Sequence, residues 1–253
     1  MRGFIFAAGL GTRLRPLTDT MPKALVPVCG KPLLAHVADR LIAEGFDELV
    51  VNVHHFPEQI RDFLSVFYPY ATVSDESDRL LETGGAVLHA RPLLEGCGKF
   101  LVHNVDIISD ISLRDFAASA PEDAVATLAV SERRTRRYLL FDDDMRLVGW
   151  TDTATGEVRS PNGDLDVSKY RMLAFSGIHL ISDSVFPLME EAMDGEERFP
   201  IMDFYLRICR DHPVAGYDAT GSRMVDVGKY GSLGEAEAEA AAILRTISSG
   251  RRP

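Results

Sequence analysis

Residues 4–16 read Phe4-Ile5-Phe6-Ala7-Ala8-Gly9-Leu10-Gly11-Thr12-Arg13-Leu14-Arg15-Pro16, and residues 22–28 read Pro22-Lys23-Ala24-Leu25-Val26-Pro27-Val28. The apolar start predicts a buried strand over residues 3–8 that leads into a glycine-containing loop. Glycines let the backbone approach a ligand closely, and N–H groups beside Arg13, Arg15 and Lys23 can bind phosphate oxygens. The stretch therefore predicts a phosphate-binding loop at the end of a strand, which indicates a nucleotide ligand.

Two better-known glycine motifs do not fit this loop. A dinucleotide-binding fingerprint needs a small residue where Leu14 stands, and it needs a carboxylate after the second strand. We expect that strand at residues 48–53, and it runs into His54-His55 instead. A P-loop needs Gly-Lys followed by Ser or Thr, which the sequence lacks. A plain glycine turn is the remaining alternative, but it does not explain the arginines and the lysine.

The charge distribution favours a small anionic ligand. Residues 1–31 hold five basic side chains and one acid, Asp19, although the whole chain has a formal net charge of -11. A local basic pocket in an acidic protein suits a small anion, whereas nucleic acid or an anionic membrane requires a broad basic face. We therefore expect neither nucleic acid nor a membrane as a partner.

Length and composition fit one α/β domain. The 253 residues are 46% hydrophobic, which is enough to bury one sizeable core. No apolar run approaches the roughly 18 residues that a membrane-spanning helix needs. The three cysteines, Cys29, Cys97 and Cys209, lack metal-type spacing, which favours reduced packing residues and a cytoplasmic protein.

Predicted strands and helices alternate over the first half of the chain. We expect strands at 3–8, 48–53, 71–75 and 99–105, and helices at 32–44, 57–67, 84–91 and 112–119. This alternation predicts an α/β fold, a Rossmann-like three-layer sandwich with a mostly parallel central sheet. The second half predicts strands at 124–130, 138–142, 147–150, 172–181, 213–218 and 223–227, helices at 184–194, 200–210 and 230–246, and fraying from Ser248 to Pro253. A polar loop or long hairpin is expected at 151–170, and Asp142-Asp143-Asp144 is expected in a solvated turn.

The N-terminal motif resembles the signature of the sugar-1-phosphate nucleotidyltransferases. The matching residues are Gly9-x-Gly11-Thr12-Arg13-x-x-Pro16-x-Thr18, then Pro22-Lys23, Pro27 and Lys31-Pro32. Three further stretches, Leu81–Gly85, Phe175–Ile178 and Val225–Gly228, are most similar to the short N-acetylmuramate-1-phosphate uridylyltransferases of cell-wall recycling. The resemblance implies a fold of the nucleotide-diphospho-sugar transferase type. It also implies a single domain over 1–253, with a nucleotide-binding part at about 1–120, a sugar-binding part at about 121–228 and a C-terminal helix at about 230–246.

Two aspartates are candidate metal ligands. Asp106 is expected to end a buried strand and Asp226 a short apolar one, and ligands of α/β sheets bind beyond the carboxyl ends of strands. Two separated carboxylates can hold Mg²⁺, which prefers one or two of them together with phosphate oxygens and water. The resemblance places both residues at metal-binding positions. Gly228 would allow a close backbone approach there, and simple turn or N-cap aspartates are the alternative.

The resemblance also implies the remaining site residues. Arg13 and Lys23 are implied to be catalytic. Nucleotide binding is implied for Ala7, Ala8, Gly9, Gly11, Thr12, Arg13, Glu82, Thr83, Gly84, Gly85 and Asn104, and sugar binding for Ser176 and Gly177. We expect Thr83 to cap a helix, and the paired glycines to leave a backbone edge open to a planar base. A glycine inside a strand, at 177, indicates close ligand approach.

Two departures from the family pattern affect the predicted pocket. Val105 stands where relatives often have glycine beside the metal. The Glu-Lys-Pro of the glucose- and thymidine-type relatives has no obvious counterpart. Its region holds Arg133, Arg134, Arg136 and Arg137, one of which is a candidate ligand of the acceptor phosphate or of a lactyl carboxylate. A solvated charge cluster is the alternative for each arginine. No hexapeptide repeat follows residue 230, so no acyltransferase β-helix is expected.

The implied reaction is in-line attack of a sugar 1-phosphate on the α-phosphorus of a nucleoside triphosphate, with Mg²⁺ and release of pyrophosphate. We expect UTP and N-acetylmuramate 1-phosphate to be the substrates, and we expect the protein to be a monomer or a small homo-oligomer. Guanylyl, thymidylyl or cytidylyl transfer to mannose, heptose or glucose 1-phosphate or to phosphocholine stays open, as does a regulatory paralogue that only binds nucleotide sugars. A glycosyltransferase that consumes nucleotide sugars is disfavoured, because Gly11-Thr12-Arg13 with Pro22-Lys23 suits a triphosphate.

Overall fold

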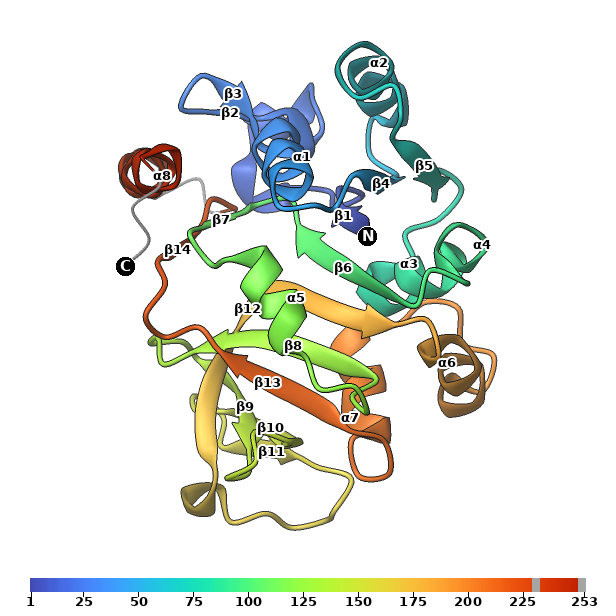
Figure 1. Ribbon diagram of the computed structural model, residues 1–253, viewed down its shortest axis with the longest axis vertical. Coiled ribbons are helices and arrows are strands. Elements are labelled where there is room, and N and C mark those ends of the chain that lie inside the picture. Colours follow the sequence, from blue (N-terminus) through green and yellow to red (C-terminus); the bar gives the residue numbers. More distant parts are fainter. Residues whose placement is uncertain (229–232, 250–253) are drawn as a thin grey trace. The chain divides into compact units, whose positions relative to one another are not determined.

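The structure, a computed structural model, describes residues 1–228 and 233–249 (Figure 1). The chain forms two compact units, both discontinuous in sequence. Unit 1 comprises Met1–Leu80, Leu101–Arg114 and Ser222–Pro253, and unit 2 comprises Leu81–Phe100 and Asp115–Gly221. The predicted start of the last helix at residue 230 and the predicted fraying at 250–253 lie outside the described residues.

Unit 1 is built on a parallel sheet. Its strands follow the order β6 (Lys99–Asn104), β1 (Arg2–Phe6), β4 (Glu48–Val53) and β5 (Thr72–Asp75). β1 pairs with β4, and β4 pairs with β5, both in parallel. The helices α1 (Leu33–Ala43) and α2 (Pro57–Phe67) connect these strands (Figure 1). The predicted alternation of strands and helices is confirmed in this unit.

The apolar stripe of α1 forms part of the core of unit 1. Leu33, Leu34, Val37 and Leu41 are buried at the expected helical spacing. The helical spacing of apolar residues in the sequence also predicts Ile42 in this core, but its side chain is 44% exposed, so that part of the prediction is wrong. The helix ends where expected, because a φ of +93° at Gly45 reverses the chain at little steric cost.

Two short antiparallel pairs complete unit 1. The strands β2 (Pro27–Val28) and β3 (Lys31–Pro32) pair with each other, which the sequence did not predict. The strand β7 (Ile107–Ser109) pairs with β14 (Met224–Asp226), so that Ile107 lies opposite Asp226. The helix α8 (Leu233–Ser248) packs against both β7 and β14. The pairing of β7 with β14 joins residues that are more than a hundred positions apart in the sequence.

Unit 2 holds a mainly antiparallel sheet. β8 (Ala126–Ser131) lies between an antiparallel neighbour, β12 (Arg171–Ser182), and a parallel one, β13 (Val214–Asp218). Closer to its N-terminal end, at residues 171–173, β12 pairs with β9 (Arg137–Phe141), and the antiparallel strands β10 (Leu147–Asp152) and β11 (Glu157–Arg159) follow. β11 lies within the polar segment 151–170 and forms a hairpin with β10, which is one of the two forms expected.

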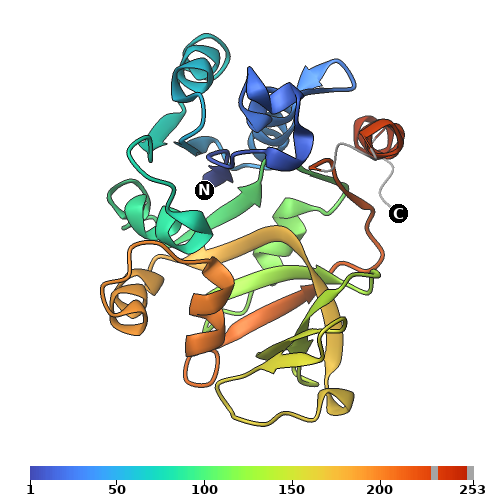
Figure 2. The same cartoon turned by 180° about the vertical axis from the view of Figure 1, so that it is seen from behind.

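The helices of unit 2 are α3 (Glu82–His89), α4 (Arg91–Leu94), α5 (Leu113–Ser119, of which the first two residues belong to unit 1), α6 (Val185–Met193) and α7 (Ile201–Ile208). α7 packs against α3, α6 and β10, as the view from behind in Figure 2 shows. The short helix α4 was not predicted as an element of its own.

In unit 2 the strand β12 is irregular at Gly177, and the predicted turn at the acidic triplet is confirmed. The β12–β8 register shifts between Phe175 and His179, and Gly177 has a φ of +74° inside this bulge. The acidic triplet forms the turn between β9 and β10, where Asp142 Oδ1 accepts hydrogen bonds from the N–H groups of Asp144 and Arg146, at 3.1 and 2.8 Å. The triplet therefore closes a hairpin.

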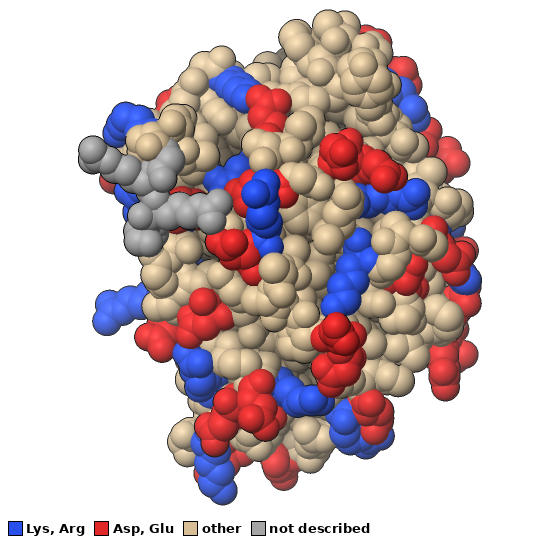
Figure 3. All heavy atoms as spheres, viewed as in Figure 1, with Lys and Arg blue, Asp and Glu red and all other residues tan. Residues whose placement is uncertain are grey.

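The surface in Figure 3 mixes both signs of charge. On that face, the described Lys and Arg side chains are interspersed with Asp and Glu and form no continuous basic area. Within residues 1–228 and 233–249, no helix combines the length and the apolar character needed to cross a membrane.

Candidate active site

The predicted phosphate loop follows β1 in unit 1, and its two glycines serve different purposes. Gly11 has a φ of +63°, and a Cβ there would lie 2.7 Å from Thr18 Cγ2. Thr18 Oγ1 also donates a hydrogen bond of 2.9 Å to the Gly11 carbonyl oxygen. At exposed Gly9, by contrast, a Cβ would meet no atom within 4 Å. Gly11 therefore shapes the turn, whereas Gly9 leaves space that a ligand can approach.

The start of this loop is held by Asn52, a residue that sequence reasoning missed. Its Oδ1 accepts hydrogen bonds from the N–H groups of Ala7 and Ala8, at 2.7 and 3.2 Å, and its Nδ2 donates to Glu76 Oε1 at 2.7 Å. These two amides are therefore engaged within the protein. The sequence signal for this role was a single amide side chain among the apolar residues of β4, because a buried polar group needs a hydrogen-bond partner.

Arg13, the arginine expected to bind the nucleotide phosphates, is exposed next to exposed Thr12. Among the described residues, none forms an ion pair or hydrogen bond with its guanidinium, whereas Arg15 pairs with Asp19 at 3.3 Å.

Asn104 ends β6, and its carbonyl oxygen accepts a hydrogen bond of 2.8 Å from His103 Nδ1. Burial lowers the pKa of His103 to about 4, so that its ring is neutral at neutral pH.

Lys23, Asp106 and Asp226 form what we call the charged cluster. Lys23 Nζ donates a hydrogen bond to Asp106 Oδ2, and the two side chains are only 12% and 11% exposed. A Cβ on Gly228 would lie 2.7 Å from Asp106 Oδ2, 2.8 Å from Asp226 Oδ1 and 3.1 Å from Lys23 Nζ. Three ionisable groups therefore converge on one point, which stays clear because residue 228 has no side chain.

The backbone explains why the two aspartates meet. The β7–β14 pairing places Asp226 opposite Ile107, and the N–H of Val227 donates a hydrogen bond of 2.9 Å to the Asp106 carbonyl oxygen. We expected Asp106 to end a strand, but β6 already ends at Asn104 and Asp106 lies in the turn before β7. Val105 is 3% exposed, and its N–H bonds the Phe6 carbonyl oxygen at 3.3 Å. The side chain of Val105 therefore packs in the protein interior and does not obstruct the protein surface.

The segment Glu82–Gly85 begins α3 in unit 2, and two details expected of it are wrong. Thr83 lies inside the helix, and its Oγ1 accepts a hydrogen bond of 2.9 Å from the Ile201 N–H instead of capping α3. The N–H groups of Gly84 and Gly85 both donate to the Phe199 carbonyl oxygen, at 2.8 and 3.2 Å. A Cβ on Gly84 would lie 2.3 Å from the Phe199 ring. The glycines thus allow close packing against residues 197–199, and this edge is not open; a contact of the segment with the base stays a prediction.

The predicted sugar-binding residues also belong to unit 2. Ser176 is buried, and Gly177 forms the bulge of β12. Next to them, Arg133 Nη2 donates a hydrogen bond of 2.8 Å to the Phe175 carbonyl oxygen. The structure thus brings the predicted catalytic and metal residues Lys23, Asp106 and Asp226 together within unit 1. The segments Glu82–Gly85 and Ser176–Gly177 lie in the other unit.

Comparison with known proteins shows the family to which the chain belongs. A sequence profile of the family described as nucleotidyl transferase matches residues 2–242. The chain belongs to the nucleotidyl transferase family. This nucleotidyl transferase is 36% identical over 248 residues to the N-acetylmuramate alpha-1-phosphate uridylyltransferase of Neisseria meningitidis serogroup B. The aligned region covers 96% of this chain and 99% of the relative. The protein of the same name from Caulobacter vibrioides is 35% identical over 228 residues, or 86% of this chain and 88% of the relative.

A solved structure supports the fold. The inositol-1-phosphate CTP transferase of T. maritima superimposes on this nucleotidyl transferase with a TM-score of 0.76 at 17% identity, covering 96% of this chain and 95% of the other. The predicted α/β fold and the predicted resemblance to sugar-1-phosphate nucleotidyltransferases are confirmed. The family is enzymatic, and the relatives support nucleotidyl transfer to a sugar 1-phosphate as its activity.

The charged cluster of this nucleotidyl transferase has the donor groups that Mg²⁺ requires. Mg²⁺ binds oxygen ligands and commonly uses one or two carboxylates, with phosphate oxygens and water completing the shell. Asp106 and Asp226 supply two carboxylates that face the same point beside Gly228. Within the described residues, no group of three or more His, Cys, Asp and Glu side chains forms a metal site. Two carboxylates fit an ion that shares its coordination with substrate phosphates.

Proposed function

We propose that this protein transfers UMP from UTP to N-acetylmuramate 1-phosphate and releases pyrophosphate. The observation that carries the proposal is the convergence of Lys23, Asp106 and Asp226 on the space beside Gly228. A cation and two carboxylates at one point suit the joining of two phosphate groups. The two N-acetylmuramate alpha-1-phosphate uridylyltransferases that align over most of the chain support this choice of base and acceptor.

The chemistry needs no protein nucleophile. The phosphate monoester of the acceptor is itself a nucleophile, so the protein has to bring two anions together and neutralise the charge that develops. Arg13 is exposed and carries a guanidinium that suits the β- and γ-phosphates of the nucleotide. Lys23 balances Asp106 in this structure, and it can exchange this partner for the α-phosphate and the acceptor phosphate.

Asp106 and Asp226 are the residues that would hold Mg²⁺. The bound ion supplies Lewis-acid stabilisation of the transferring phosphoryl group and orients the leaving pyrophosphate. The two side chains are fixed for this role by the β7–β14 pairing and by the hydrogen bond of 2.8 Å from the Gly228 N–H to Asp226 Oδ1. We place the reaction in the cytoplasm and assign both units to one functional domain.

Pyrophosphate release with Mg²⁺ tests the proposal. UTP, GTP, dTTP and CTP are each combined with the 1-phosphates of N-acetylmuramate, N-acetylglucosamine, glucose and mannose, and with phosphocholine. We expect turnover to be strongest with UTP and N-acetylmuramate 1-phosphate, and to disappear in an Asp106→Asn variant that still folds. Strongest turnover with another pair would overturn the substrate assignment but keep the chemistry. Nucleotide binding without turnover for every pair would favour a regulatory paralogue.

A further inference from the structure

The sheet that β7 and β14 form in unit 1 has only two strands, each of three residues. A sheet of two strands is marginally stable by itself, and such short strands have few backbone hydrogen bonds to fix their alignment. The alignment nevertheless decides where Asp226 lies, because the pairing places it opposite Ile107, the residue after Asp106. A further contact is therefore needed to hold the two strands in register.

A change of register would separate the two carboxylates of the charged cluster. Side chains alternate between the two faces of a strand, so a shift of one residue would turn Asp226 to the opposite face. A shift of two residues would restore the face but move Asp226 by about 7 Å along the strand. The convergence of Asp106 and Asp226 beside Gly228 therefore depends on this register.

Asp110, the residue after β7, closes the end of the ladder that lies away from the charged cluster. Its N–H donates a hydrogen bond of 3.1 Å to the Arg223 carbonyl oxygen, which continues the ladder by one residue. The Arg223 N–H donates to Asp110 Oδ1 at 2.7 Å, and Arg223 Nε donates to Asp110 Oδ2 at 3.2 Å. One carboxylate therefore binds both the backbone and the side chain of the residue that precedes β14.

Burial makes this contact specific for one register. The Asp110 side chain is 4% exposed, and a buried carboxylate is costly unless it is paired and hydrogen-bonded. In a shifted register another residue would face Asp110, and the carboxylate would lose its contacts with Arg223. Arg223 is also held from a second side, because its Nη2 donates a hydrogen bond to Thr246 Oγ1 of α8. The contact between Asp110 and Arg223 therefore favours the observed register over its alternatives.

We propose that Asp110 and Arg223 are positioning residues of the active site, which fix the register of β7 with β14 and so keep Asp226 beside Asp106. The part of the inference that concerns Mg²⁺ rests on the proposed function. In the described part of the chain, no hydrogen bond or ion pair joins either side chain to the charged cluster, so both act through the backbone of the two strands.

Binding of Mn²⁺ tests the effect on the metal site, because carboxylates that suit Mg²⁺ also bind this ion. Electron paramagnetic resonance measures the free ion, so no turnover is required. We expect Asp110→Ala to raise the Kd of Mn²⁺ at least about tenfold, as is typical when a group that orients a metal ligand is removed. Asp110→Asn keeps an acceptor for the Arg223 N–H and loses the ion pair, so we expect a rise of about threefold. This variant carries the test if Asp110→Ala does not fold.

A second background shows whether Asp110 acts through Asp226. Asp226→Asn removes the carboxylate that Asp110 is proposed to position. In that background we expect Asp110→Ala to change the Kd of Mn²⁺ less than about twofold, because two residues that act through one contact are not additive. An equal rise in both backgrounds would mean that Asp110 affects metal binding by another route, and this result would overturn the proposal.

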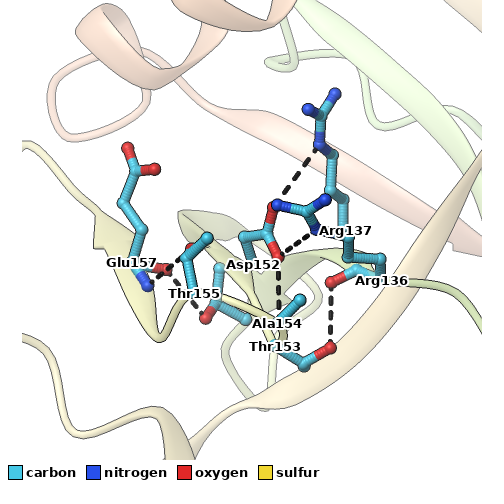
Figure 4. Close-up of polar contacts among 8 residues, drawn as sticks. Arg136, Arg137, Asp152, Thr153, Ala154, Thr155 and Glu157 are labelled. Carbon is cyan, nitrogen blue, oxygen red and sulfur yellow. Dashed lines mark hydrogen bonds and ion pairs between the residues drawn. The ribbon is translucent and has the colours of Figure 1, made fainter.

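Asp152 in unit 2 provides the matched control. It is also 4% exposed, and its Oδ1 accepts hydrogen bonds from Arg136 Nε at 2.7 Å and from the Ala154 N–H at 3.0 Å, as Figure 4 shows. Asp152→Ala therefore removes a carboxylate of the same burial with the same kinds of partner. We expect it to lower the thermal stability but to leave the Kd of Mn²⁺ unchanged. If Asp110→Ala gave the same result as Asp152→Ala, Asp110 would be a structural residue only and the proposal would fail.

Hydrogen–deuterium exchange separates the inference from the proposed function, because it needs neither metal nor substrate. We expect the amides of residues 223–227 to exchange at least about tenfold faster in Asp110→Ala, since local opening becomes easier, and at the wild-type rate in Asp152→Ala. If exchange is faster but the wild-type protein binds no Mn²⁺, the register assignment holds and the metal role of the charged cluster fails. Unchanged exchange would overturn the positioning role, even if pyrophosphate release showed the proposed reaction to be correct.

Discussion

In the charged cluster of unit 1, Lys23 and Asp106 pair with each other at 12% and 11% exposure, whereas Arg137 at the start of β9 in unit 2 is 69% exposed and lies 3.7 Å from its partner Asp152. The first arrangement commits each charge to a fixed partner, so the loss of one member affects the others. The second leaves a charge accessible to solvent. Buried, mutually paired charges can contribute a preorganised electrostatic environment, whereas an exposed pair contributes little.

The largest effect expected from this comparison is in the charged cluster. We expect Lys23→Ala and Asp106→Ala each to lower kcat at least about a hundredfold with every acceptor, because each removes a preorganised electrostatic contact. Lys31→Ala is the matched control, since Lys31 also pairs with an aspartate, Asp39, but at 39% and 51% exposure. Steady-state kinetics, with thermal unfolding to check folding, measures both. Near-wild-type turnover in Lys23→Ala would remove this lysine from the mechanism.

A glycine in unit 2 should affect stability next. A Cβ on Gly84 would lie 2.3 Å from the Phe199 ring and 2.8 Å from the Phe199 carbonyl oxygen. We expect Gly84→Ala to lower the free energy of unfolding by about 1–3 kcal/mol, because overpacking forces the backbone to shift. Denaturant titration measures this, with Gly221→Ala, whose Cβ would meet no atom within 4 Å, as control. If Gly84→Ala were as stable as the wild-type protein, close packing against Phe199 would not explain the glycine. The result would then favour the prediction that Gly84 and Gly85 contact the base.

Gly228 in unit 1 should show the opposite behaviour and a smaller effect. Its Cβ would meet the ends of side chains, Asp106 Oδ2 and Asp226 Oδ1, which can shift at a lower cost than the Phe199 backbone. We therefore expect Gly228→Ala to lower the free energy of unfolding by less than Gly84→Ala does, by about 1 kcal/mol or less. We expect kcat to fall about tenfold, because part of the electrostatic preorganisation is lost. A stability loss without a kinetic effect would contradict the distinction between the two glycines.

Much of the fold could be predicted because the pattern of apolar residues is clear. The strand at 48–53 and the helix at 57–67 were predicted with the observed bounds, and both lie between clear turn signals. The short pairs β2–β3 and β7–β14 were not predicted as pairs. Strands of two or three residues have no period to detect, and their partners are set by the tertiary structure.

The site was predicted only as far as side-chain chemistry reveals it. The structure brings Lys23, Asp106 and Asp226 together, and their catalytic and metal-binding roles stay predictions. Asn52 was missed because its side chain binds two backbone amides, and the sequence of the loop does not indicate which side chain accepts their hydrogen bonds. Gly84 and Gly85 were misjudged, since a glycine that faces a ligand and a glycine that faces Phe199 look the same in a sequence.

The pairing of β7 with β14 has a consequence for the order in which the protein is made. A ribosome delivers Lys23 and Asp106 first, and Asp226 and Gly228 follow only after all of unit 2 has been synthesised. Until then β7 lacks its partner strand, and the nascent chain carries one of the two carboxylates of the cluster. The protein therefore acquires its complete charged cluster only after the whole of unit 2 has been synthesised, so that unit 2 can begin to fold before the cluster is complete.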